Sequence, residues 1–251
     1  MDATMEEEPL TGDDGQQERE SEGEEQHEQQ EQQGEQEEER KGEMMRLEEE
    51  CYVSGSGDTL IFFFPDGSGL SAQNQRVADQ LGQAGYVVMP DLLQGDTHAT
   101  PPLHILQQAD EPLIQKVKDV AVAGFGRFGM EMWLARHTDE KTVPIMQRVV
   151  QAAKERFTPR HTLVAGVGFG GNMALVLAGG DGVEACAVAK PMLTGRATLD
   201  ALRKPTLLLH NPLDPFFGPQ DVEYAREHAT VKEMDEETSF VEEMLNYFQS
   251  L

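Results

Sequence analysis

Cysteine, tryptophan and long apolar runs are scarce in this sequence. Its 251 residues include two cysteines and one tryptophan. Two lone thiols, Cys51 and Cys186, indicate a reducing compartment and small buried side chains, because a disulfide framework needs more cysteines. The histidines and cysteines do not have the spacing of metal ligands. No apolar stretch is long enough to span a membrane. The acidic start of the chain is unlike a signal peptide. We expect a cytoplasmic protein without metal or cofactor.

Basic residues are also few. The chain has 20 lysines and arginines against 46 aspartates and glutamates, a formal net charge of −26. This balance argues against nucleic acid and membrane as partners, since both repel an acidic surface. Residues 1–50 contain 21 acidic and 4 basic residues and few large apolar side chains. We predict a disordered acidic tail there, which would attract a protein partner with a basic surface.

The remaining residues, 51–251, are enough for one domain. Short apolar runs predict buried strands at 58–64, 86–89, 162–167, 185–189 and 206–210, with amphipathic helices between them. The helices are expected at 71–83, 143–157, 219–227 and 239–251, with one more directly after the third strand. Strands that alternate with helices in this way predict an α/β fold with a doubly wound, mostly parallel sheet. Residues 92–141 are predicted to be an irregular, long connection of the kind that often carries a substrate pocket. We expect Trp133, within this stretch, to be a packing anchor.

A glycine cluster, Gly166-Val167-Gly168-Phe169-Gly170, separates the third strand from its helix. We expect Gly166 and Gly170 to allow strained backbone angles and a close approach of helix to strand. This strand–turn–helix arrangement is typical of a nucleophile elbow, in which the middle residue is raised above the sheet. That middle position is Gly168, which has no side chain with which to attack a substrate.

Several ordered segments carry a resemblance to a known family. They are Phe63–Leu70 (FFPDGSGL), Val77–Leu81 (VADQL), Ala84–Leu92 (AGYVVMPDL), Trp133–His137 (WLARH), the glycine elbow, and Lys204–Leu209 (KPTLLL), which leads to Asp214. With these segments the chain from about residue 58 to its end resembles the dienelactone hydrolase family of α/β hydrolases. The resemblance implies the α/β-hydrolase fold and hydrolysis of lactones and related esters by a Cys-Asp-His triad.

Two of the three triad positions that the resemblance implies are substituted here. The family's nucleophilic cysteine falls on Gly168, and its histidine falls on Thr238. The aspartate is present as Asp214. Because removal of one triad member usually costs several orders of magnitude in rate, we expect a pseudoenzyme that keeps the fold for binding or scaffolding.

A ligand site without chemistry is compatible with the same segments. Backbone N–H groups near Phe169 and Gly170, with the loop that contains Asp66, Gly67 and Ser68, are expected to hold a small anionic or ester ligand. The alternative interpretation is that these glycines only allow helix and sheet to pack closely.

Two other functions remain open from the sequence. An active hydrolase with rearranged machinery would use Ser68 as nucleophile and His210 as base, with Cys186 as a further thiol. Ser68 is more typical of a turn, and His210 and Cys186 are more typical of a core. A structural component of a larger assembly, recruited through the acidic tail or residues 92–141, is the other alternative.

Overall fold

The structure is a computed structural model that describes residues 41–98, 129–212, 214, 216–234 and 239–251. The chain divides into two units, residues 1–40 and residues 41–251, and the description that follows concerns the second. The predicted tail up to residue 40, most of the long connection and Thr238 therefore lie outside the described residues.

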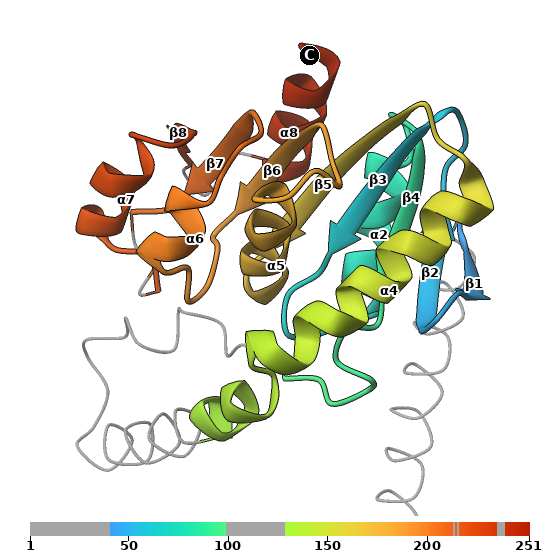
Figure 1. The fold of residues 1–251 in the computed structure, drawn as a ribbon, viewed down its shortest axis with the longest axis horizontal. Helices are drawn as coiled ribbons and strands as arrows, with labels where there is room; N and C mark the ends of the chain where they lie inside the picture. Colours follow the sequence, from blue (N-terminus) through green and yellow to red (C-terminus); the bar gives the residue numbers. More distant parts are fainter. Residues whose placement is uncertain (1–40, 99–128, 213, 215, 235–238) are drawn as a thin grey trace, which may run out of the picture. The chain divides into compact units, whose positions relative to one another are not determined.

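Eight described strands form one sheet in the order β1-β2-β4-β3-β5-β6-β7-β8 (Figure 1). The pairs β1/β2 and β2/β4 are antiparallel, and the other five pairs are parallel. This confirms the predicted mostly parallel α/β sheet. The strands are β1 (Glu43–Arg46), β2 (Glu50–Ser54), β3 (Thr59–Phe64), β4 (Tyr86–Pro90), β5 (His161–Val167), β6 (Ala185–Ala189), β7 (Thr206–His210) and β8 (Thr230–Glu233).

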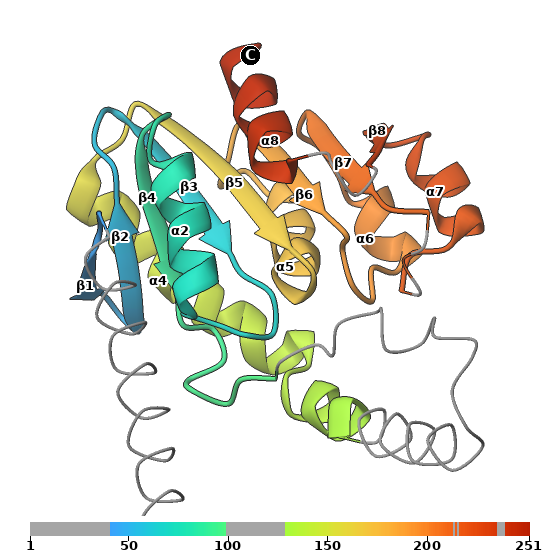
Figure 2. The same cartoon turned by 180° about the vertical axis from the view of Figure 1, so that it is seen from behind.

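Helices cover both faces of the sheet (Figures 1 and 2). One face carries α2 (Ala72–Leu81) and α8 (Phe240–Gln249). The other carries α4 (Asp139–Phe157), α5 (Phe169–Ala178), α6 (Arg196–Asp200) and α7 (Pro219–Ala225). Because both faces are covered, the central strands are apolar throughout, and every residue of β6 and β7 is buried.

The boundary of the folded unit differs from the prediction. The prediction of a disordered tail up to residue 50 is wrong for the last residues of that range, since β1 and the first residue of β2 lie before residue 51. The backbone N–H of Gly42 donates to the Tyr52 hydroxyl at 2.8 Å, and that hydroxyl donates to Asp79 of α2 at 3.0 Å. Pairing with β2 and these polar contacts hold the segment that contains β1 in place. Its few apolar side chains do not form the pattern that predicts a strand.

Residues 129–136 form a further helical segment immediately before α4. It lies in the stretch 92–141, which the sequence suggested was irregular. Within the described residues, no helix is both long and apolar enough to cross a membrane.

Candidate functional site

The glycine cluster forms the predicted turn between β5 and α5. Gly168 is the N-cap of α5 with φ +55° and ψ −120°. Its N–H donates to the Ala189 carbonyl at 3.1 Å, and its own carbonyl accepts from Met192 at 2.9 Å. The elbow is therefore held on the segment that follows β6.

Close packing explains the two outer glycines. A Cβ on Gly166 would collide with the Gly170 carbonyl, and a Cβ on Gly170 would collide with the Phe64 carbonyl. The predicted close approach of helix to strand is thus confirmed. The expectation of unusual backbone angles at these two glycines is wrong, because neither Gly166 nor Gly170 has a positive φ, and the positive φ belongs to Gly168.

The space in front of Gly168 is occupied by Asp66. A Cβ at residue 168 would lie 3.2 Å from the Asp66 Cβ, which is tighter than an ordinary van der Waals contact. The expected nucleophile position therefore has no reactive group and faces the loop that follows β3.

That loop, residues 66–69, is a hydrogen-bonded turn. The Asp66 Oδ1 atom accepts from the Ser68 N–H at 3.0 Å and from its hydroxyl at 2.5 Å. Asn74 of α2 donates to Asp66 Oδ1 at 3.0 Å and to Ser68 Oγ at 2.9 Å. Within the described residues no imidazole contacts the Ser68 hydroxyl, so its geometry is that of a turn residue.

Asp214 lies in the turn after β7. Its Oδ1 accepts from the Phe216 N–H at 2.9 Å, and its own N–H donates to Asn211 at 2.9 Å. Burial raises the pKa of the Asp214 carboxyl, an effect that the Phe216 hydrogen bond and the charges of Lys190 and His210 oppose. Lys190 directly follows Ala189, the acceptor of the Gly168 N–H. Since β6 lies between β5 and β7 in the sheet, Asp214 and the elbow lie on either side of the end of β6.

The structure does not join the residues expected for a rearranged active site. His210 is buried at the end of β7, and its Nδ1 has no hydrogen-bond partner among the described residues. Cys186 lies in the centre of β6 and is fully buried, and burial raises the pKa of its thiol far above the ordinary value. Both match the interpretation as core residues, and Thr238 lies outside the described residues.

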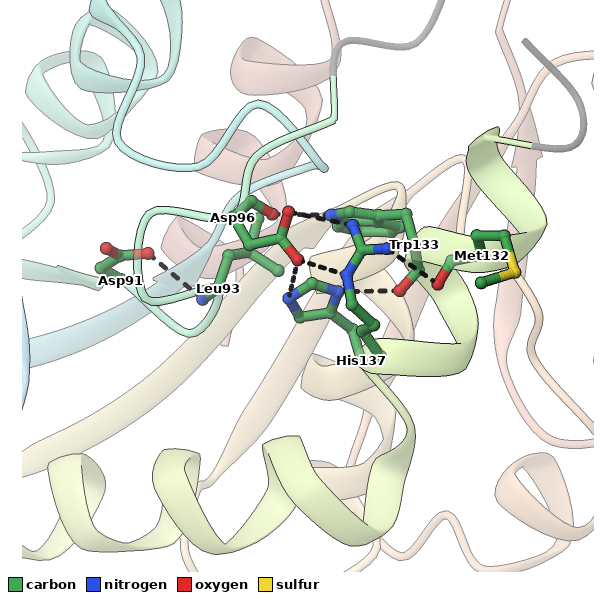
Figure 3. A network of polar contacts seen from close by, with 7 residues as sticks. Asp91, Leu93, Asp96, Met132, Trp133 and His137 are labelled. Atoms are coloured by element: carbon green, nitrogen blue, oxygen red, sulfur yellow. Dashed lines mark hydrogen bonds and ion pairs between the residues drawn. The ribbon is translucent and has the colours of Figure 1, made fainter. Parts of the chain in front are cut away.

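An aromatic and charged cluster next to the elbow was not predicted as a unit (Figure 3). Trp133 was expected to be a packing anchor, and it is 2% exposed. Its ring lies 5.1 Å from that of Phe169, edge to face, and 4.6 Å from that of His137. Its indole N–H donates to the Asp96 carbonyl at 2.6 Å. Arg136 on the same helical segment is a charge that needs an acidic partner, but the sequence analysis used it only as part of the WLARH segment.

Asp96 supplies that partner from the loop after β4. Arg136 donates to its two carboxylate oxygens at 2.7 and 3.1 Å, and the His137 Nε2 lies 3.7 Å away. The Arg136 hydrogen bond lowers the pKa of the Asp96 carboxyl below its ordinary value. Among the described residues no group of histidine, cysteine and carboxylate side chains could hold a metal ion.

These features define a class of protein: a mostly parallel sheet, a glycine elbow after a central strand and an aspartate after β7 are those of an α/β hydrolase. The family model of the dienelactone hydrolase family matches residues 56–241. The chain belongs to that family.

Solved structures support the fold. A dienelactone hydrolase from Anabaena variabilis has a TM-score of 0.50 at 18% identity, over 84% of this chain and 96% of that one. The dienelactone hydrolase-like promiscuous phosphotriesterase P91 from metagenomic libraries has a TM-score of 0.51 at 14% identity, over 84% and 97%. TT1662 from Thermus thermophilus has a TM-score of 0.53 at 14% identity, over 83% and 97%. None of the curated proteins matches this chain.

Proposed function

We propose that this protein has lost the thiolate chemistry of its family and retains the elbow as a binding site for a small anionic or ester ligand. The observation that supports this most directly is Gly168, which has the backbone angles of an elbow and no nucleophile. The other candidate nucleophiles are either bonded within a turn, as Ser68 is, or fully buried, as Cys186 is.

Binding without chemistry uses backbone donors. The first N–H groups of a helix have no acceptor within the helix, and they carry the positive end of its dipole. In α5 the Gly170 N–H, one of the expected donors, already donates to the Pro65 carbonyl at 3.0 Å. In the α/β-hydrolase fold the N–H after the elbow residue and one from the loop after β3 face the substrate oxygen. Here those positions are Phe169 and the loop that contains Asp66 and Gly67. A carboxylate or an ester carbonyl is the ligand chemistry that such donors accept.

The test is hydrolysis of p-nitrophenyl acetate by four purified proteins: native, Ser68→Ala, Gly168→Cys, and Gly168→Cys with Thr238→His. We expect the native protein and Ser68→Ala to match the rate without protein, and the double variant to turn over. Turnover by the native protein would overturn the proposal. Loss of that turnover in Ser68→Ala would then favour the rearranged hydrolase.

A scaffolding role through the acidic tail is the second candidate. It is supported by the charge of residues 1–50, which accounts for −17 of the net −26. Pull-downs with and without residues 1–40 at low and high salt test it, because attraction to a basic partner weakens as salt screens charge. Partners that are retained equally by both forms would exclude this role for the tail.

A further inference from the structure

Trp133 lies between the two loops that face the expected ligand. On one side its Cη2 atom is 3.5 Å from the point where a Cβ of Gly67 would sit. On the other side its ring packs edge-on against Phe169. Gly67 belongs to the loop after β3, and Phe169 directly follows the elbow residue. The indole therefore lies between the loop after β3 and the first residue of α5, the two segments that carry the proposed donors.

The loop after β4 holds the indole in place. Asp96 accepts the indole N–H through its carbonyl. Two residues further on, the His98 N–H donates to the Gly67 carbonyl at 2.7 Å, and the His98 ring stacks on Trp133 with 5.7 Å between centroids. This loop thus contacts both Trp133 and the loop after β3.

The ion pair that connects this loop to the helical segment 129–136 lies at the surface. The Asp96 and Arg136 side chains, which pair in two hydrogen bonds, are 43% and 51% exposed, whereas Trp133 is 2% exposed. Exposed ion pairs contribute little free energy and are screened by salt. The side chain of Trp133 is buried, whereas the ion pair beside it lies at the surface, where a single substitution removes it (Figure 3).

We propose that Trp133 is a plug that closes the elbow site, and that the Asp96–Arg136 ion pair is the latch that keeps it closed. Opening moves the residues around Asp96 and the helical segment 129–136 apart and uncovers the donors near Phe169 and Gly67. The plug is an autoinhibitory contact built into the fold. It does not depend on whether the site binds or hydrolyses its ligand, so its test is independent of ester turnover.

The elbow position itself provides the probe. Gly168→Cys places a thiol at the elbow, while the native Cys51 and Cys186 are fully buried. We would measure alkylation by iodoacetamide, which is uncharged, and locate the label by mass spectrometry. Five proteins are compared: Gly168→Cys alone, and the same variant with Asp96→Asn, with Arg136→Gln, with both of these changes, or with Arg160→Gln. Arg160 forms an exposed ion pair with Asp58 at 3.5 Å and serves as the matched control.

If the latch controls access, Asp96→Asn and Arg136→Gln each raise the alkylation rate at residue 168 about fivefold, because the rate follows the open population. The two changes together give no more than either alone, since they remove the same contact. Arg160→Gln leaves the rate unchanged. Equal rates in all five proteins, or an equal rise with Arg160→Gln, would overturn the proposal.

A second measurement avoids the elbow substitution, in case Gly168→Cys does not fold. Trp133 is the single tryptophan of the chain, so acrylamide quenching of its fluorescence reports its exposure directly. In proteins that keep the native Gly168, we expect the quenching constant to rise with Asp96→Asn and with Arg136→Gln but not with Arg160→Gln. Quenching that stays at the native value in both latch variants would equally overturn the proposal.

Discussion

Gly170 of α5 rests directly on the carbonyl of Phe64, the last residue of β3, with no room for a Cβ between them. We predict that Gly170→Ala lowers the free energy of unfolding by about 3 kcal/mol, because a methyl group must push the helix off the sheet. The Phe64 carbonyl is rigid backbone and cannot turn aside. Urea denaturation measures the change.

Gly180→Ala is the matched control for that substitution. A Cβ at Gly180 would lie 3.6 Å from the Leu177 carbonyl, an ordinary contact. We expect a change within about 0.5 kcal/mol of the native value. A Gly170→Ala protein as stable as this control would contradict the close approach of α5 to β3.

Both native thiols are expected to be inert in the folded protein. Cys51 and Cys186 are fully buried, and burial raises the pKa of the Cys51 thiol to about 12. Alkylation proceeds through the thiolate, so neither residue should react at neutral pH. Mass spectrometry should find no label on the native protein and two labels after unfolding in denaturant. A label on the native protein would contradict this burial.

The pH dependence of stability should carry the signature of Asp214. Its pKa is raised in the folded state, mainly by burial. The stability that protonated Asp214 contributes is therefore present below the ordinary pKa of an aspartate and is lost as the pH rises through the raised value. Asp214→Asn keeps an acceptor for the Phe216 N–H and removes the charge. We expect the variant to gain stability relative to the native protein as the pH rises from about 3 to about 7, the range in which carboxyl groups titrate. Urea unfolding measures this difference. A constant difference would contradict the prediction.

Asp96 should show the opposite dependence. Its pKa is lowered, above all by the Arg136 hydrogen bond. Its contribution is present above the ordinary carboxyl pKa and is lost as the pH falls through the lowered value. Acidification should therefore increase acrylamide quenching of Trp133 before far-UV circular dichroism reports unfolding. In Asp96→Asn the quenching should be high already at neutral pH. Identical pH profiles for the two proteins would argue against a role of the carboxylate.

The sequence predicted the central sheet well because its strands are continuous apolar runs. The predicted range of β6, residues 185–189, and of β7, residues 206–210, is that of the structure. The strands β1, β2 and β8 were missed because they are short and partly polar: β1 reads EMMR, β2 reads ECYVS and β8 reads TVKE. Edge strands gain their conformation from pairing with a neighbour, which a pattern of single residues does not contain.

The sequence predicted the part of the candidate site that local backbone geometry determines. The elbow at Gly168 follows from the order of strand, glycines and helix. The contact of Asp96 with Arg136 joins residues 40 positions apart, and only the fold brings them together. The sequence identified Trp133 as an anchor but could not indicate that its ring lies between Gly67 and Phe169.

The backbone angles of Gly168 also concern the trade-off between catalytic activity and thermodynamic stability. A cysteine at φ +55° would store conformational strain of about 1–3 kcal/mol, which an active enzyme must carry for its nucleophile. Glycine has the same angles without a Cβ and so without that strain. Glycine at this position therefore allows a relaxed fold while the turn is preserved. Under the proposed loss of thiolate chemistry, thermodynamic stability favours glycine here, and a cysteine at residue 168 would have to overcome that gain.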